Sequence, residues 1–321
     1  MAEEGFLFHQ NENAGQKQES WIKAPYQSLD ELETKLEAIC RQLGERAKKL
    51  KAGISQYGTK PAQLLNASEL FSRVSHREMV HTIQHGEFHS YQQPIINLKE
   101  GDRIYAFESL LRTAGRNQIP PGVLFKTAEE TGLMSMLDQK AREAAIKARK
   151  NIIPPGIKSF INFLPSTIYN PDFCLQHTFQ IVEKYEIDPA DLVFEVVETE
   201  KISDVDHLKK VLNTYKKRGM KVALDDVGAG FSTLEMLEAL QPDYLKIDRS
   251  FIDHCDQKPE SQQFLSKVMN IADGLGIIVL AEGIERKEEL EFCRSIGADL
   301  AQGYYIGRPA KDVEAALLVN S

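Results

Sequence analysis

From residue 76 onward, short runs rich in apolar and β-branched residues alternate with amphipathic helical stretches. Of the stretches between the later runs, 206–219 and 261–276 have helical spacing and end in glycine, which commonly terminates helices. About eight strands with interleaved helices predict a (β/α) barrel, an α/β fold. The predicted strands are 89–96, 103–111, 160–163, 192–197, 221–226, 244–248, 277–282 and 300–305.

The first two predicted strands are joined only by residues 97–102, a connection too short for a crossover helix. Two strands joined in this way must pair antiparallel as a hairpin. We therefore predict a modified TIM barrel in which one strand runs against the others.

The chain before the barrel has a different pattern. Residues 1–27 are polar with a few aromatics, which predicts a tail or a docked loop. A helix is expected from Ser28, which forms a capping box with Glu31. Its apolar residues form a heptad seam that would either pack on its own domain or join two chains. The seam residues are Leu29, Leu32, Leu36, Ile39, Leu43, Ala47 and Leu50.

A second capping box, Ser75 with Glu78, predicts the start of the helix that leads into the barrel. We place the domain boundary here. Residues 1–75 are then an N-terminal helical and regulatory extension, and residues 76–321 are the barrel.

Composition and net charge exclude some classes of binding partner. The chain is 42% hydrophobic and 27% charged, which is typical of a globular protein, and its net charge of -8 argues against polymeric nucleic acid. Its four cysteines lack metal-ligand spacing, which favours reduced thiols. No basic, apolar leader and no run of about 18 apolar residues occurs, so we expect a cytoplasmic protein that does not enter a membrane.

Polar residues end the predicted strands, which in a barrel meet at one face. Each alone is explained as a surface or capping residue. Together, carboxylates converging on one barrel mouth would repel unless cations bind between them. The strand-end residues are Glu108, Asn162, Glu195, Asp225, Asp226, Asp248, Glu282 and Gln302.

An all-oxygen ligand set selects Mg²⁺ or Mn²⁺ over zinc. The adjacent Asp225 and Asp226 indicate two ions, with Asp225 as the bridge. Two such ions suit phosphodiester hydrolysis. The expected metal ligands are Glu108, Asn162, Glu195, Asp225, Asp226 and Glu282.

Lys246 and Asp248 are predicted to share one strand and point into the barrel. Lys246 would relay a proton and stabilise negative charge on a phosphate, or else form a structural ion pair with Asp248. Residues 227–232 form a glycine-containing loop after the Asp pair. Glu285 would accept hydrogen bonds from that loop, or else begin a solvated helix.

In order, from about residue 76 to 318, the chain resembles the EAL family of cyclic di-GMP phosphodiesterases. The matching motifs are Tyr91-Gln92-Gln93-Pro94-Ile95, Phe107-Glu108-Ser109-Leu110-Leu111-Arg112, Asn162, Glu195-Val196-Val197-Glu198, Asp225-Asp226, Lys246-Ile247-Asp248, Ala281-Glu282-Gly283-Ile284-Glu285 and Gln302-Gly303-Tyr304.

The resemblance implies that the six expected ligands bind two Mg²⁺ or Mn²⁺ ions and that Lys246 assists the attacking water. It implies hydrolysis of cyclic di-GMP to linear pGpG, and a homodimer formed through the barrel and linked to the metals by the loop after the Asp pair. We assign catalysis to Lys246 with Glu108, Asp225, Asp226 and Glu282. We assign substrate binding to Gln93, Arg112, Asp248 and Gln302, and loop stabilisation to Glu285.

The sequence departs from the family pattern at Ser109, Val197, Val227 and Ala229, although every matching ligand is present. The main alternative is a catalytically silent cyclic di-GMP receptor that signals through its N-terminal region. A His-Asp phosphodiesterase is excluded because no His-Asp dipeptide occurs. The chain also has no Gly-Gly-Asp-Glu-Phe-like signature of a synthase.

Overall fold

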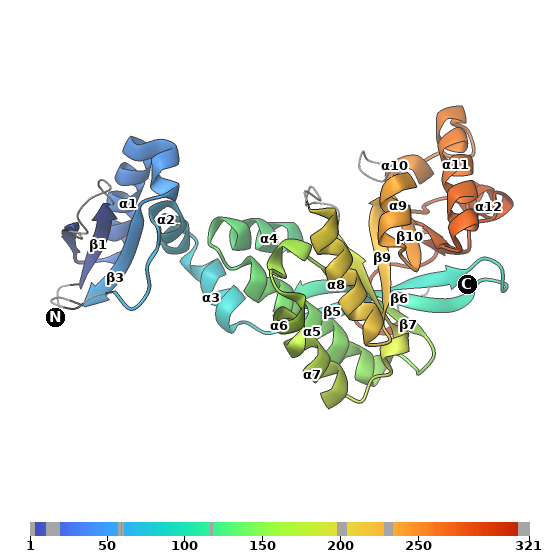
Figure 1. Cartoon of the computed structure of the whole chain (residues 1–321), viewed down its shortest axis with the longest axis horizontal. Coiled ribbons are helices and arrows are strands. Elements are labelled where there is room, and N and C mark those ends of the chain that lie inside the picture. The colour runs from blue at the N-terminus through green and yellow to red at the C-terminus, as the bar shows by residue number, and fades with distance from the viewer. Residues whose placement is uncertain are drawn as a thin grey trace. The chain divides into compact units, whose positions relative to one another are not determined.

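The chain folds into two compact units, drawn in Figure 1 from the computed structural model. The structure describes residues 4–10, 20–56, 59, 61–115, 118–197, 204–227 and 234–313. One unit comprises residues 1–87 with 119–137, and the other comprises residues 88–118 with 138–321. The boundary near residue 75 stays a prediction, because this division does not follow a single cut in the chain.

The larger unit is a closed barrel with the strand order β10-β11-β12-β5-β6-β7-β8-β9. All the predicted barrel strands are confirmed, each within a few residues of its expected bounds. The strands are β5 (Phe88–Asn97), β6 (Arg103–Thr113), β7 (Lys158–Phe163), β8 (Leu192–Val196), β9 (Lys221–Val227), β10 (Tyr244–Ile247), β11 (Ile278–Ala281) and β12 (Leu300–Gln302).

The predicted hairpin is also confirmed. Strand β5 pairs antiparallel with both β6 and β12, whereas the other neighbouring strands pair in parallel. The turn between β5 and β6 is closed by the Asp102 N–H, which donates to the Asn97 carbonyl at 3.0 Å. Asp102 and Gly101 both have positive φ there, as a tight turn requires. One strand therefore runs against the rest of the barrel.

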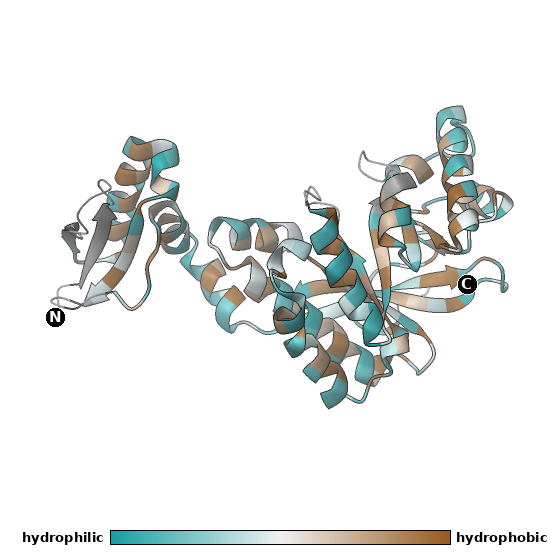
Figure 2. Ribbon diagram, viewed as in Figure 1, coloured by the Kyte–Doolittle hydropathy of each residue, from teal (hydrophilic) through white to brown (hydrophobic). Residues whose placement is uncertain are grey.

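Helices cover the outside of the barrel (Figure 1). Leu208, Val211, Leu212 and Tyr215 of α8 are buried in the layer between helices and strands, whereas the visible side of this helix is hydrophilic (Figure 2). Helix α11 ends as predicted, at Gly276 in the left-handed conformation. The helices are α5 (Met134–Ile152), α6 (Pro171–Cys174), α7 (Gln176–Lys184), α8 (Val205–Lys217), α9 (Leu234–Leu240), α10 (Arg249–Ile252), α11 (Pro259–Leu275) and α12 (Lys287–Ser295).

An apolar plug fills the interior of the barrel. Each strand contributes one buried residue to it, so the interior is a packed core and not a pore. The plug residues are Ile95, Ala106, Phe160, Val193, Ala223, Tyr244, Leu280 and Leu300.

The smaller unit is not purely helical, which corrects the predicted helical extension. An antiparallel sheet with the order β2-β1-β3-β4 accompanies its helices. Residues predicted as a tail or loop form β1 (Glu4–Gln10) and β2 (Ser20–Tyr26). The unit also contains β3 (Lys51–Gln56), β4 (Leu65–Asn66), α1 (Leu29–Leu43), α2 (Ala67–Ser75), α3 (Arg77–His85) and α4 (Pro121–Glu130).

Helix α1 begins as predicted, because the Ser28 hydroxyl accepts a hydrogen bond from the Glu31 N–H at 3.2 Å. It ends at Leu43, earlier than the heptad pattern suggested. Leu32 and Leu36 are fully buried in a core shared with β3 and α2, so these two seam residues pack within their own unit, whereas the joining of two chains stays a prediction.

The second predicted capping box is wrong. Ser75 is the last residue of α2, and α3 starts at Arg77 without a side-chain cap. The pattern did locate a helix start, but it misread the short break between two consecutive helices.

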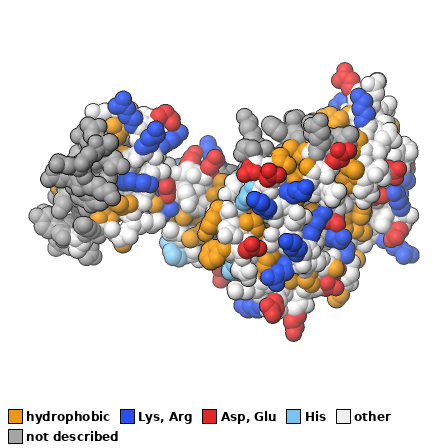
Figure 3. Space-filling model, in the orientation of Figure 1, with side chains coloured by type: hydrophobic (Ala, Val, Ile, Leu, Met, Phe, Trp, Pro, Cys, Tyr) orange, Lys and Arg blue, Asp and Glu red, His pale blue; other side chains and the backbone are white. Residues whose placement is uncertain are grey.

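Two features of the structure bear on binding to membranes and to charged partners. Among the described residues, no helix is both long enough and apolar enough to cross a membrane. On the face of the barrel unit visible in Figure 3, basic and acidic side chains are interspersed.

Candidate active site

A polar layer lies directly on the apolar plug. Side chains two positions apart on a strand point to the same side. The residue two positions away from each plug residue therefore also faces the barrel axis. In the parallel strands the polar residue lies two positions after the plug residue, and in the reversed strand β5 it lies two positions before it. These positions are Gln93, Glu108, Asn162, Glu195, Asp225, Lys246 and Gln302 within the strands and Glu282 directly after β11.

Lys246 is the centre of this layer, with a side chain only 1% exposed. Its Nζ lies 2.7 Å from Glu282 Oε1, 3.1 Å from Asp225 Oδ1 and 3.8 Å from Glu108 Oε1, and it forms a closer ion pair with Glu195. Four strands therefore bring carboxylates to one ammonium group. The predicted convergence of these residues is confirmed.

The charges in this layer depend on one another. Burial lowers the pKa of Lys246, but Asp225, Glu108, Glu195 and Glu282 outweigh that effect and raise it well above the ordinary value. Burial raises the pKa of Glu195 and of Glu282 well above the glutamate value, although Lys246 pulls both down. One lysine is therefore too little positive charge for the carboxylates around it.

The oxygen atoms of the layer suit divalent cations. Glu108 is held by Asn162 Nδ2 at 3.1 Å and by Gln302 Nε2 at 2.7 Å. Within the described part of the chain, Oε1 of Glu195 and Oε1 of Gln302 are buried without a hydrogen-bond partner. Leaving a buried acceptor unsatisfied is costly, and hard cations bind such oxygen atoms. The side chains present therefore fit the predicted Mg²⁺ or Mn²⁺ ligands.

A cavity of about 230 Å³ opens beside the layer and is lined in part by Gln93, Glu108, Glu282 and Gln302. Gln93 is anchored by a hydrogen bond from its Nε2 to the Gly307 carbonyl at 3.2 Å. Two of the four predicted substrate-binding residues, Gln93 and Gln302, thus reach both the polar layer and a cavity. Their role in substrate binding stays a prediction.

Asp248 does not lie on a strand, which corrects the sequence-based prediction. Strand β10 ends at Ile247, and Asp248 caps α10 by accepting a hydrogen bond from the Ser250 N–H at 2.9 Å. The alternative of a structural ion pair between Lys246 and Asp248 is wrong, because Lys246 pairs with the four carboxylates. Asp248 still lines the cavity, so its predicted role in substrate binding stays open.

Arg112 follows Glu108 by four residues on β6 and thus shares its side of the strand. Its guanidinium carbon lies 5.1 Å from the centre of the Tyr91 ring, and the Tyr91 hydroxyl accepts a hydrogen bond from Gln118 Nε2 at 2.9 Å. Arg112 is therefore held at the active-site end of the barrel. Its binding role stays a prediction.

Several predicted features fall outside the described residues. These are residues 228–232 of the predicted loop at 227–232, with Ala229, and the side chains of Asp226 and Val227. Glu285 lies at the cavity and forms an ion pair with Arg249, at 2.9 Å between Oε1 and Nη2. Its predicted contact with the loop stays a prediction.

The sequence analysis gave no role to two residues that line the cavity, and it did not explain why residue 303 is a glycine. Arg249 and Tyr304 line the cavity. Arg249 directly follows the motif Lys246-Ile247-Asp248, and Tyr304 ends the motif Gln302-Gly303-Tyr304 but was given no role, so the motifs themselves were the available signal. A Cβ atom on Gly303 would lie 2.1 Å from the Ile284 carbonyl oxygen, so only glycine lets these two segments approach.

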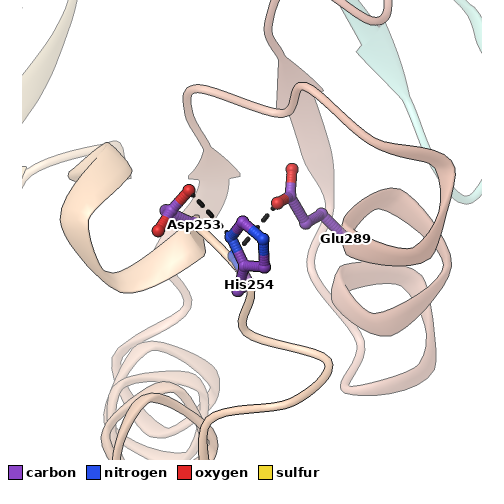
Figure 4. A group of neighbouring side chains, drawn as sticks. All are labelled: Asp253, His254 and Glu289. Carbon is purple, nitrogen blue, oxygen red and sulfur yellow. Dashed lines mark hydrogen bonds and ion pairs between the residues drawn. The ribbon is translucent and has the colours of Figure 1, made fainter.

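A second acidic cluster, shown in Figure 4, consists of Asp253, His254 and Glu289. Glu289 already accepts four hydrogen bonds, from the N–H groups of His254, Glu285 and Arg286 and from Arg286 Nε, at 2.9–3.1 Å. These contacts cap α12 and leave the carboxylate no oxygen lone pair to spare. The cluster is explained as a helix cap.

The EAL domain model matches residues 76–309 of this chain. Among curated proteins, the probable cyclic di-GMP phosphodiesterase PdeG of Escherichia coli K12 is 32% identical over 246 residues. The aligned region covers 74% of this chain and 48% of PdeG, so the chain spans about half the length of that relative.

Two solved structures are similar at 29% identity and a TM-score of 0.64 each. A standalone EAL protein of Vibrio cholerae, in its c-di-GMP bound form, matches over 71% of this chain and 94% of its own. The manganese and cyclic di-GMP complex of Klebsiella pneumoniae BlrP1 matches over 70% of this chain and 57% of its own. With the family match over 76–309, these likenesses identify the chain as a member of the EAL domain family.

Proposed function

We propose that this chain hydrolyses cyclic di-GMP to linear pGpG with two Mg²⁺ or Mn²⁺ ions. The observation that carries the proposal is the polar layer, in which four carboxylates, two of them from neighbouring strands, surround one buried lysine beside a cavity. The name of PdeG supports cyclic di-GMP as the substrate. The BlrP1 complex, which contains manganese and cyclic di-GMP, supports the use of a divalent cation.

The ligand residues would be Glu108, Asn162, Glu195, Asp225, Asp226 and Glu282. When bound, the cations would polarise a phosphoryl oxygen and make a water molecule nucleophilic near neutral pH.

The protein's own side chains prepare the site. Asn162 and Gln302 hold the Glu108 carboxylate in one orientation through their amide N–H groups. Lys246 supplies a fixed positive charge that keeps the carboxylates together and would stabilise negative charge that grows on the phosphate. Gln93 and Gln302 would orient the nucleotide in the cavity with Asp248, and Arg112 would attract its phosphates.

One departure from the family pattern has a structural explanation. The Ser109 hydroxyl is buried and donates to Gln92 Oε1 at 3.0 Å, so serine is accommodated without an unsatisfied group. Val197, Val227 and Ala229 are not among the proposed ligands and bear on turnover, so the assay below separates hydrolysis from the alternative of a receptor that binds cyclic di-GMP without hydrolysing it. We also propose a cytoplasmic homodimer, in line with the family resemblance.

The test is incubation of the purified full chain with cyclic di-GMP and Mn²⁺, with chromatographic detection of pGpG. Glu108→Ala should abolish turnover while the protein stays folded by circular dichroism. Glu143→Ala, a half-exposed glutamate on α5, is the matched control and should keep full activity. Binding without pGpG would replace hydrolysis by the receptor function, and an insoluble Glu108→Ala protein would mean that Glu108 is structural.

A further inference from the structure

We propose that the buried ion pair Asp138–Arg142 on α5 is a positioning site that sets the orientation of Asn162, and through it the affinity of the metal site. Neither residue touches the polar layer. The inference rests on the proposed function, because it assigns Asn162 to a bound cation.

The pair anchors the segment that leaves β7. The side chains of Asp138 and Arg142 are 2% and 4% exposed and form a close ion pair. Asp138 Oδ1 accepts the Leu164 N–H at 3.0 Å, and its Oδ2 accepts the Thr167 hydroxyl at 2.8 Å. Arg142 Nε donates to the Thr178 hydroxyl on α7 at 3.2 Å. One buried carboxylate therefore joins α5 to the first turn after the strand.

This anchor acts close to the metal site. Leu164 is two residues beyond Asn162, and the β7–β8 ladder ends at Phe163. Past this point Asp138 holds the Leu164 N–H, and Thr167, whose hydroxyl also contacts Asp138, holds the Leu164 carbonyl. Asn162 in turn donates to Glu108 Oε1 at 3.1 Å. A shift at Leu164 would therefore change the direction of Asn162 and the position of Glu108.

Stability alone is a weak reason for such a pair. Replacing both members of a buried ion pair by apolar residues is often neutral or stabilising, whereas fixed polar contacts specify one local geometry. Outer contacts that orient metal ligands typically change metal affinity by about 10- to 100-fold when removed. The location of this pair, at the end of a ligand-bearing strand, agrees with the second role.

The same helix offers a matched control. Arg149 and Asp191 form another buried ion pair, with side chains 4% and 7% exposed. Arg149 Nη1 donates to the Ile157 carbonyl at 2.6 Å and to the Ser159 hydroxyl at 2.8 Å. These contacts lie at the start of β7, at the opposite end of the strand from Asn162. Removing the Arg149–Asp191 pair takes away a buried ion pair of the same kind as Asp138–Arg142, but it leaves the end of β7 that carries Asn162 unchanged.

The experiment compares two double variants of the full chain, Asp138→Leu/Arg142→Met and Asp191→Leu/Arg149→Met. The Mn²⁺ dissociation constant is measured by electron paramagnetic resonance of the free ion, without substrate, and circular dichroism monitors folding. We expect the first double to weaken Mn²⁺ binding about tenfold and the second to change it less than about twofold. Equal weakening in both, or no change in the first, would overturn the inference.

A milder pair of variants decides the matter if a double fails to fold. Thr167→Val removes one contact to Asp138 and one to the Leu164 carbonyl, and it should weaken Mn²⁺ binding by about threefold. Thr178→Val removes a contact to Arg142 and should leave Mn²⁺ binding unchanged. Identical Mn²⁺ affinities of the Thr167→Val and Thr178→Val variants would refute the inference. If the unaltered protein binds no Mn²⁺, the proposed function fails and this inference with it, a result distinct from normal binding in all variants.

Discussion

Replacement of Lys246 by Met tests whether the lysine acts as the counter-charge of the polar layer. The change removes an ammonium group that is 1% exposed and contacts four carboxylates, while the volume stays similar. Glu195, which is fully buried, would lose the ion pair that offsets its burial. We expect the metal-free protein to become less stable and turnover to be lost.

The magnitude follows from the burial. Removing one partner of a buried ion pair typically costs about 3–5 kcal/mol. The lower end is expected here, because burial already raises the pKa of Glu195 and protonation of that group limits the cost. For a domain of this size about 3 kcal/mol lowers the melting temperature by about 6–12 °C. Saturating Mn²⁺ should narrow this gap, because bound cations then neutralise the same carboxylates.

The assay is thermal unfolding in EDTA and in excess Mn²⁺. Lys221→Met is the control, because the Lys221 side chain is 47% exposed and pairs with Asp243 at the surface. Such a surface pair contributes about 0–1 kcal/mol, so this variant should melt within about 4 °C of the unaltered protein. The reasoning is refuted if the two variants lose the same stability in EDTA, or if Mn²⁺ leaves the Lys246→Met deficit unchanged.

Further predictions concern pH, packing and the smaller unit. Burial raises the pKa of Glu195 and Glu282 above the ordinary value of 4.5, so the folded chain keeps protons that the unfolded chain releases. Thermal melts in EDTA should therefore show stability falling as pH rises from 4.5 through the raised pKa values, and stabilisation by Mn²⁺ should grow over that range. Gly303→Ala should cost about 1–3 kcal/mol in chemical unfolding, because its Cβ would meet backbone atoms. Gly274→Ala, with open space around it in α11, should be neutral or stabilising by up to about 1 kcal/mol, and the opposite order would contradict the packing argument. Deleting residues 1–75 should leave a folded barrel but expose α4, which packs against α2, to limited proteolysis; an unchanged digestion pattern would count against this.

Local patterns were enough for the barrel because strands and helices have different periods. The strands from β6 to β12 were visible as apolar runs with a polar residue at or near the end, and the short link at 97–102 required the reversed strand β5. The N-terminal sheet was missed for a physical reason. Strand β1 pairs with β3, more than forty residues away, and such pairing depends on the partner strand and not on the segment's own propensity.

Asp248 shows the limit of an argument from alternation. Two positions after Lys246, it continues the strand pattern in the sequence, but β10 has already ended and the residue caps a helix. Strand ends depend on which neighbours remain to accept hydrogen bonds, and these neighbours come from distant parts of the chain.

Sequence alone therefore determined which polar residues lie near the strand ends and that Lys246 points inward, because strand patterns and the alternation of side chains along a strand are local properties of the backbone. From it came the all-oxygen ligand set and the place of Lys246 among the inward residues. Only the tertiary structure decided that Lys246 meets Glu108, Glu195, Asp225 and Glu282 together. Which side chains touch across a closed barrel depends on the register and closure of its strands, and these are set by contacts between segments far apart in the chain.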